Sequence, residues 1–77
     1  MYYVTMTDSF MSGWGCAKGK INKFVIACDN YSQAEEVAEK AHKRPEMKYI
    51  RIARNIPYYS PGRYLVSYRE YREIHWQ

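Results

Sequence analysis

The segment from Cys28 to Pro45, CDNYSQAEEVAEKAHKRP, constrains the fold more than any other part of the chain, because it predicts one amphipathic helix. Small apolar residues recur in it at i, i+3, i+4 and i+7, which places a narrow stripe along one side of the helix. The stripe consists of Ala34, Val37, Ala38 and Ala41. Side chains of this size suit close packing on a sheet, so we interpret the stripe as core and the surrounding charges as a solvated face.

Both ends of the predicted helix carry ordinary end signals. Asn30 or Ser32 can cap the N-terminus, since a short polar side chain can accept a hydrogen bond from the first-turn N–H groups. Ser32 also has capping-box spacing to Glu35. Acidic residues come early and basic residues late, an order that complements the partial charges at the helix ends. Pro45 then stops the helix, and folding alone accounts for all of these signals.

Four other segments are rich in residues that favour strands. They are Tyr2–Thr7, Ile21–Cys28, Met47–Arg54 and Arg63–Tyr71. The two prolines and the glycine of Asn55–Gly62 make that stretch a turn or loop. The predicted order is therefore strand, strand, helix, strand, strand.

This order predicts a two-layer α+β fold, ββαββ, formed by residues 1–77 as a single domain. A right-handed crossover from the second strand to the third passes over the first strand and gives the sheet order 2-1-3-4, antiparallel throughout. The helix covers one face of this four-stranded sheet, and we expect the other face to be uncovered.

Alternation along the strands assigns the side chains to two faces. The inward positions of the first three strands are Tyr2, Val4, Met6, Phe24, Ile26, Cys28, Ile50 and Ile52. On the fourth strand Tyr64, Val66 and Tyr68 are placed inward, although the opposite assignment is only slightly worse. The outward aromatic and basic residues are then Tyr3, Lys23, Tyr49, Arg51, Arg63, Arg69 and Tyr71. No carboxylate is expected at an outward strand position, because five of the eight acidic residues lie in or beside the helix.

Three interpretations of this tyrosine- and cation-rich face stay open. Bases can stack on tyrosine while arginine and lysine neutralise phosphate, which suits nucleic acid. Arginine and tyrosine also anchor many protein interfaces, which suits a protein or ribonucleoprotein with an acidic surface. The third interpretation is a solvated face with cross-strand packing, or a homodimer contact.

A glycine-punctuated connection, Asp8 to Lys20, is long for a hairpin, and long loops in compact domains are often binding elements. Its large apolar residues Phe10 and Trp14 are candidate contact residues. They are equally suited to covering one end of a small core. The glycines lack the spacing of a phosphate-binding motif.

No catalytic or metal-binding signature is present in the sequence. His42 lies at a helix end and His75 in the tail, and neither accompanies a recognisable nucleophile motif. Glu35 and Glu36 point to different sides of the helix. We therefore expect no enzymatic activity, no metal and no cofactor.

Net charge and cysteine spacing limit the kinds of partner and the cellular compartment that we expect for this protein. The formal net charge of +4 argues against a protein that imitates DNA by displaying carboxylates, and it favours acidic partners. Cys16 and Cys28 have neither metal-binding spacing nor a secreted disulfide pattern, so we expect reduced thiols in a cytoplasmic protein. No apolar stretch approaches the roughly 18 residues of a membrane span.

The run YYVTMTDSFMSGWGCAKGKINKFVIACDNYSQAEEVAEKA resembles short uncharacterised proteins encoded by bacteriophages and mobile elements. Such proteins often inhibit host defence, and anti-CRISPR proteins with a sheet and one helix are similar in size and design. The resemblance implies a non-enzymatic inhibitor that docks on a host nucleoprotein effector. It transfers no functional residues, and a nucleic-acid-binding accessory protein is the alternative.

Overall fold

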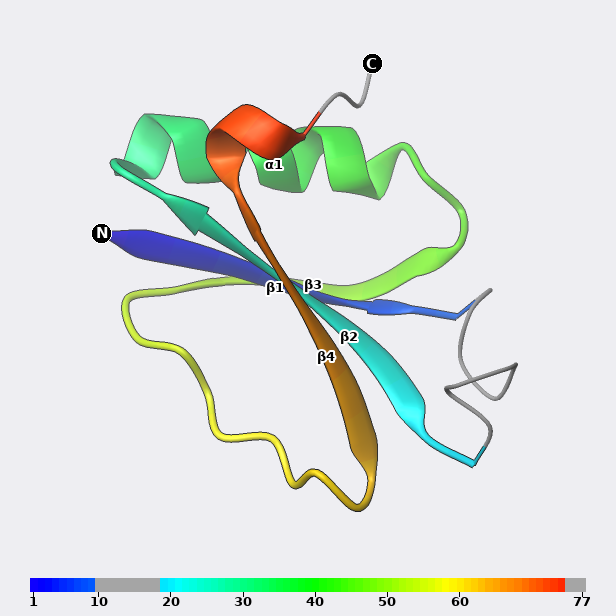
Figure 1. Cartoon of the computed structure of the whole chain (residues 1–77). Helices are drawn as coiled ribbons and strands as arrows, with labels where there is room; N and C mark the ends of the chain where they lie inside the picture. Colours follow the sequence, from blue (N-terminus) through cyan, green and yellow to red (C-terminus); the bar gives the residue numbers. More distant parts are fainter. Residues whose placement is uncertain (10–18, 75–77) are drawn as a thin grey trace.

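The structure is a computed structural model that describes residues 1–9 and 19–74, so the candidate contacts Phe10 and Trp14 lie outside the described residues. It has the expected α+β organisation, with one helix lying on a four-stranded sheet (Figure 1). The elements are β1 (Tyr2–Asp8), β2 (Ile21–Cys28), α1 (Tyr31–His42), β3 (Met47–Ala53), β4 (Tyr64–Glu70) and the short 3-10 helix η2 (Tyr71–Glu73).

Helix α1 begins at the first of the two predicted caps. The side-chain oxygen of Asn30 accepts a hydrogen bond of 2.8 Å from the backbone N–H of Gln33. Ser32 lies inside the helix, so the predicted Ser32–Glu35 capping box is wrong. Asn30 is the N-cap because its backbone is extended, the conformation that a capping residue requires.

The predicted apolar stripe faces the sheet: Ala34, Val37 and Ala41 are buried and Ala38 is partly buried. Helix α1 packs mainly on β3 and β1. The core consists of Val4, Met6, Ile26, Cys28, Ala34, Val37, Ala41 and Met47. Tyr2, Phe24, Ile50 and Ile52 pack against it. The inward assignments of the first three strands are therefore confirmed.

The strand order is β3-β1-β2-β4, which corrects the predicted order 2-1-3-4. As predicted, β1 lies between β2 and β3 and pairs antiparallel with both strands. The fourth strand lies at the opposite edge from its predicted place, beside β2, and it runs parallel to β2. The sheet is therefore mixed.

Residues 54–63, which we call the crossing segment, make this order possible. Strands β3 and β4 run in the same direction, so the chain must return along the sheet and cross three strand spacings before β4 begins. That path is about 23 Å along and about 14 Å across, or about 27 Å in all, and ten extended residues reach about 33 Å. Figure 1 shows this segment, in yellow, on the side of the sheet away from α1.

Two features favour β2 over β3 as the partner of β4. The register between β1 and β3 shifts between Thr5 and Thr7, which marks a bulge, and a bulge makes the outer edge of β3 a poor template for another strand. Pairing with β2 also covers Val25, whose side chain lies on the face opposite the helix and is only 1% exposed. Without β4, that apolar side chain would border an open edge.

Parallel pairing reverses the predicted face of β4. Tyr64, Val66 and Tyr68 stand in register with Ile21, Lys23 and Val25, so they lie on the face opposite α1. Their inward assignment is therefore wrong. The prediction of an uncovered second face is also wrong in part, because Ile56 of the crossing segment lines a hollow on that face with Tyr3 and Val25, and the Tyr59 ring of the same segment lies 5.8 Å from Lys23.

After β4 the chain turns toward α1, and a hydrogen bond from Tyr71 connects η2 to this helix. The Tyr71 hydroxyl donates a hydrogen bond of 2.8 Å to Glu36 Oε2, which also accepts one of 3.2 Å from Lys40 Nζ. Tyr71 and then Lys40 lower the pKa of Glu36, and the carboxylate in turn raises the pKa of Tyr71.

We predict that Tyr71→Phe lowers the free energy of unfolding at neutral pH, because the phenyl ring keeps the packing and loses the hydrogen bond. Tyr68→Phe is the matched control, since the Tyr68 hydroxyl makes no hydrogen bond within residues 1–9 and 19–74. Urea unfolding followed by circular dichroism measures both. Equal stability of the two variants would contradict a role for this bond.

The same pair of groups predicts a pH dependence. Glu36 has a depressed pKa, so its contribution is present above the ordinary value of 4.5 and disappears as the pH falls through the folded value. Tyr71 has a raised pKa, so its contribution is present below 10.0 and disappears as the pH rises through the folded value. The stability difference between wild type and Tyr71→Phe should therefore be largest between these limits and shrink at both ends.

Candidate binding surface

A tyrosine–lysine cluster occupies the face of the sheet opposite α1. It consists of Lys23, Tyr49, Tyr59 and Tyr64. The Lys23 ammonium lies 5.8 Å from the ring centroid of Tyr49 and 5.8 Å from that of Tyr59. The Tyr59 and Tyr64 rings are 5.3 Å apart at a tilt of 59°. Side chains from β2, β3, the crossing segment and β4 thus form one cluster, in which Lys23 is the cation.

The charge of Lys23 is not matched by a carboxylate. Partial burial lowers its pKa, and the nearby Arg51 guanidinium lowers it further. None of the ion pairs in residues 1–9 and 19–74 involves Lys23. The tyrosine rings supply some compensation, since a cation lying over an aromatic face is worth about 0.5–1 kcal/mol at an exposed site. An anionic group of a binding partner could neutralise the remaining positive charge of Lys23.

The cluster borders a groove that is open to solvent. The groove has a volume of about 410 Å³ and is lined by Thr7, Ser9, Ile21, Lys23, Tyr49 and Tyr64. Arg51 lies on the same face of β3, in register with Thr5. The groove therefore offers ring faces, hydroxyl groups and a cation to a bound group.

Tyr49 reaches this groove because of the bulge in β3. Two residues, Tyr49 and Ile50, stand between the partners of Thr5 and Thr7, where a regular ladder has one. Tyr49 has a φ of 55°, in the left-handed region, and is the one non-glycine residue of the described chain with positive φ. Its side chain is 75% exposed. A bulky residue in this conformation is uncommon, and such strain often marks a functional position.

The structure brings together some of the predicted contact residues and separates the others. Tyr3, Lys23, Tyr49 and Arg51 lie on the face opposite α1. The remaining predicted contact residues do not lie there. Arg69 is in register with Ile26, so it leaves the strand on the helix side, and its guanidinium turns back at the strand edge to donate a hydrogen bond of 2.9 Å to the Tyr68 carbonyl oxygen. Tyr71 bonds to the helix, and Arg63 lies in the turn before β4.

Sequence reasoning missed Tyr59 and Tyr64. Tyr59 follows Tyr58 between two prolines, and this aromatic pair in a proline-rich connection was the available signal. Tyr64 was placed on the wrong face. The expectation that no carboxylate lies outward is also wrong, because Glu70 is in register with Ala27 and lines a hollow with Glu73.

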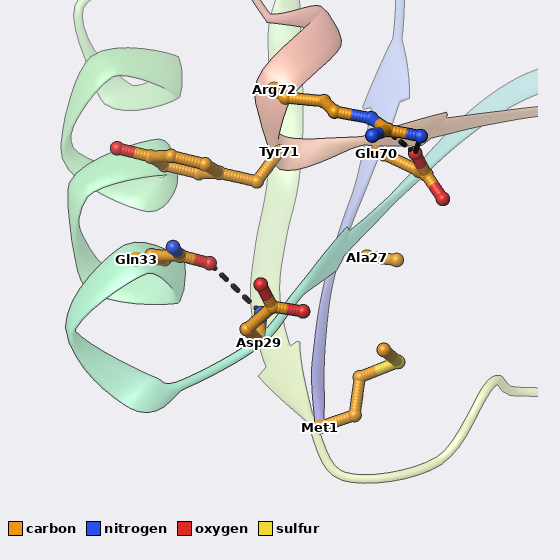
Figure 2. A pocket seen from close by; sticks show the side chains of 7 residues that line it. All are labelled: Met1, Ala27, Asp29, Gln33, Glu70, Tyr71 and Arg72. Carbon is orange, nitrogen blue, oxygen red and sulfur yellow. Dashed lines mark hydrogen bonds and ion pairs between the residues drawn. The ribbon is translucent and has the colours of Figure 1, made fainter.

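A second pocket, of about 320 Å³, lies between η2 and the start of α1 (Figure 2). Most of its polar side chains already have partners. Arg72 pairs with Glu70 at 2.8 Å, and Gln33 Oε1 accepts a hydrogen bond of 2.9 Å from the backbone N–H of Asp29. Figure 2 shows both interactions at the rim, with Tyr71 directed toward α1. These interactions join η2 to the start of α1, so we interpret this pocket as part of the packing between them. The tyrosine–lysine cluster is the stronger candidate for a binding site.

The other chemical groups offer little reactivity. Cys28 is buried, and burial is the main cause of its raised pKa, so the thiol stays protonated. No group of three or more potential metal ligands gathers within residues 1–9 and 19–74. In the same residues, no helix combines the length and apolar character that a membrane span needs.

No family model matches the chain, and comparisons with curated proteins and with solved structures find no significant match. The geometry of the face opposite α1 is therefore the main basis for a functional proposal.

The strained backbone at Tyr49 predicts an unusual response to glycine. A left-handed conformation costs a bulky residue about 1–2 kcal/mol, whereas glycine adopts it freely. Tyr49→Gly should therefore leave the free energy of unfolding within about 1 kcal/mol of wild type. Arg51→Gly, at an exposed extended position of the same strand, should cost about 1 kcal/mol. Equal losses in urea titrations would contradict a strained Tyr49.

Proposed function

We propose that this chain is a non-enzymatic binding protein that docks through the tyrosine–lysine cluster on an anionic surface of a host nucleoprotein complex. The observation that carries the proposal is Lys23, a partly buried cation between two tyrosine rings with no carboxylate partner in the described chain. An anionic group placed over Lys23 would offset the repulsion between Lys23 and Arg51, and it would raise the lowered pKa of Lys23.

The surrounding rings add area and selectivity to this anchor. Tyrosine offers a large apolar surface with a polar tip at low entropic cost, which is why it is enriched in binding surfaces. Tyr49 and the neighbouring Tyr58 are 75% and 85% exposed, so both are available to a partner. Lys23, Tyr49 and Tyr64 extend from three strands of one hydrogen-bonded sheet. Their backbones are therefore already ordered, which limits the conformational entropy lost on binding.

The sequence resemblance to small proteins of bacteriophages and mobile elements suggests the biological form of this function. Inhibition of a host defence complex, in the manner of anti-CRISPR proteins, suits a small basic domain without catalytic groups. Such a protein would cover an acidic protein recess or a site where the effector holds nucleic acid.

We predict that Lys23→Gln reduces capture of the nucleoprotein effector at least about tenfold, because it removes the charge that the cluster surrounds. Arg69→Gln is the matched control: it removes the same charge from the helix side of β4. Effector pull-down and inhibition of target cleavage, each with wild type and both variants, measure the effect. Unchanged capture and inhibition by Lys23→Gln would exclude this cluster as the contact.

Direct binding of nucleic acid is the second candidate, favoured by the exposed ring of Tyr49 beside the Lys23 cation. It predicts that affinity for a labelled single-stranded oligonucleotide falls steeply with salt as counterions are released. Lys23→Gln should lower the slope of log K against log salt by about 0.7, the value for one phosphate contact on a single strand. Absence of binding at low salt in fluorescence anisotropy would leave the nucleoprotein proposal alone.

A further inference from the structure

The groove beside the tyrosine–lysine cluster differs from two other hollows of the molecule in the charge of its lining. Asp29 and Glu70 line the pocket between η2 and α1, and Glu70 and Glu73 line the hollow on the face opposite α1. No carboxylate is among the described residues that line the groove, and its one charged side chain is Lys23. Of these three hollows, only the groove offers an anion an opposite charge and no like charge.

The lining of the groove also supplies hydrogen-bond donors. The side-chain hydroxyls of Thr7, Tyr49 and Tyr64 make no hydrogen bond within residues 1–9 and 19–74. Lys23 adds the N–H groups of its ammonium, which has no carboxylate partner in the same residues. A phosphate group has three strong acceptor oxygens, whereas a carboxylate has two. The set of donors therefore suits a phosphate better than a carboxylate.

Two cations on different strands approach each other beside the groove. Lys23 is in register with Thr7 and Arg51 with Thr5, so both leave the sheet on the face opposite α1. Regular sheet spacing puts their Cα atoms about 12 Å apart. Their long side chains bring the charges close enough for Arg51 to lower the pKa of Lys23. Adjacent cations favour a doubly charged anion, and a phosphomonoester carries about −1.5 to −2 at pH 7, more than a carboxylate or a phosphodiester.

The groove is larger than a phosphate group alone requires. Its volume of about 410 Å³ lies within the range of about 300–1,000 Å³ that is usual for small-molecule sites. Tyr49 lines it and is 75% exposed, and Ile21 adds apolar surface. A planar base can stack on an exposed tyrosine ring. The space beside the phosphate position therefore suits a nucleoside.

We propose that the groove binds the 5′-monophosphate of a nucleoside, with the phosphate at Lys23 and Thr7 and the base against the ring of Tyr49. Arg51 supplies the second positive charge. The inference rests on the proposed function, because it uses the same Lys23 anchor and names the chemistry of the anionic group. That group occurs both in a free nucleotide and at the 5′ end of a nucleic-acid strand.

Matched ligands test the chemistry by isothermal titration calorimetry of the full chain. Adenosine 5′-monophosphate is a fair probe, because stacking on an aromatic ring tolerates any base. It should bind at least about fivefold more tightly than ribose 5-phosphate, which has no base to stack. It should also bind about tenfold more tightly than its methyl ester, which carries a single charge. Absence of binding at millimolar adenosine 5′-monophosphate, or equal affinity for this nucleotide and either analogue, would overturn the proposal.

Variants assign the two halves of the ligand to their residues. Lys23→Gln should weaken the binding of both adenosine 5′-monophosphate and ribose 5-phosphate by about tenfold, because it removes the charge at the phosphate. Tyr49→Gly should weaken only the nucleotide, since it removes the ring at a position whose backbone conformation glycine adopts freely. Lys43→Gln, which removes the same charge just after α1, is the control. If it weakens nucleotide binding as much as Lys23→Gln does, the phosphate does not lie at Lys23 and the proposal is wrong.

Further comparisons identify the source of the nucleotide and separate this inference from the proposed function. Tighter binding of an oligonucleotide with a 5′-phosphate than of the same strand with a 5′-hydroxyl identifies a strand end as the ligand. Equal binding of the two strands, with adenosine 5′-monophosphate bound, identifies the free nucleotide. Loss of effector capture by Lys23→Gln without any nucleotide binding overturns this inference and leaves the proposed function standing. Nucleotide binding with unchanged capture supports the inference and overturns the proposed function.

Discussion

The parallel pairing of β4 with β2 is the constraint on which the rest of the structure depends. Because β3 and β4 run in the same direction, the crossing segment must return along the face opposite α1. That path brings Tyr59 to Lys23 and places Tyr64 beside it. A hairpin between β3 and β4 would have left Lys23 on an open, solvated face. The same pairing therefore determines both the sheet order and the environment of the candidate anchor.

Local patterns were sufficient to predict much of the fold. The helix, the four strands and the adjacency of β2, β1 and β3 follow from apolar periodicity and from the crossover over β1. The inward faces of these strands were also predictable, because the narrow stripe of α1 buries every second residue beneath it. Ile52 keeps its predicted side because the bulge precedes it in β3, and Ile50, within the bulge, still packs against the core.

The position of β4 and the composition of the site were not predictable in the same way. The strand YLVSYRE has apolar residues on both faces, so alternation hardly distinguishes Tyr64 and Val66 from Leu65. Its partner depends on the path of the crossing segment, which no local pattern encodes. The alternation of MKYIRIA likewise conceals the bulge, and so the left-handed backbone that exposes Tyr49. Nonlocal pairing decides these features.

The bulge in β3 and the parallel pairing of β4 together assemble the candidate site. The bulge places the ring centroid of Tyr49 5.8 Å from the Lys23 ammonium. The parallel pairing brings the Tyr59 ring to the same distance from Lys23 and sets Tyr64 against Tyr59. A regular antiparallel sheet would supply neither arrangement, so the candidate anchor depends on the two places where this sheet departs from one.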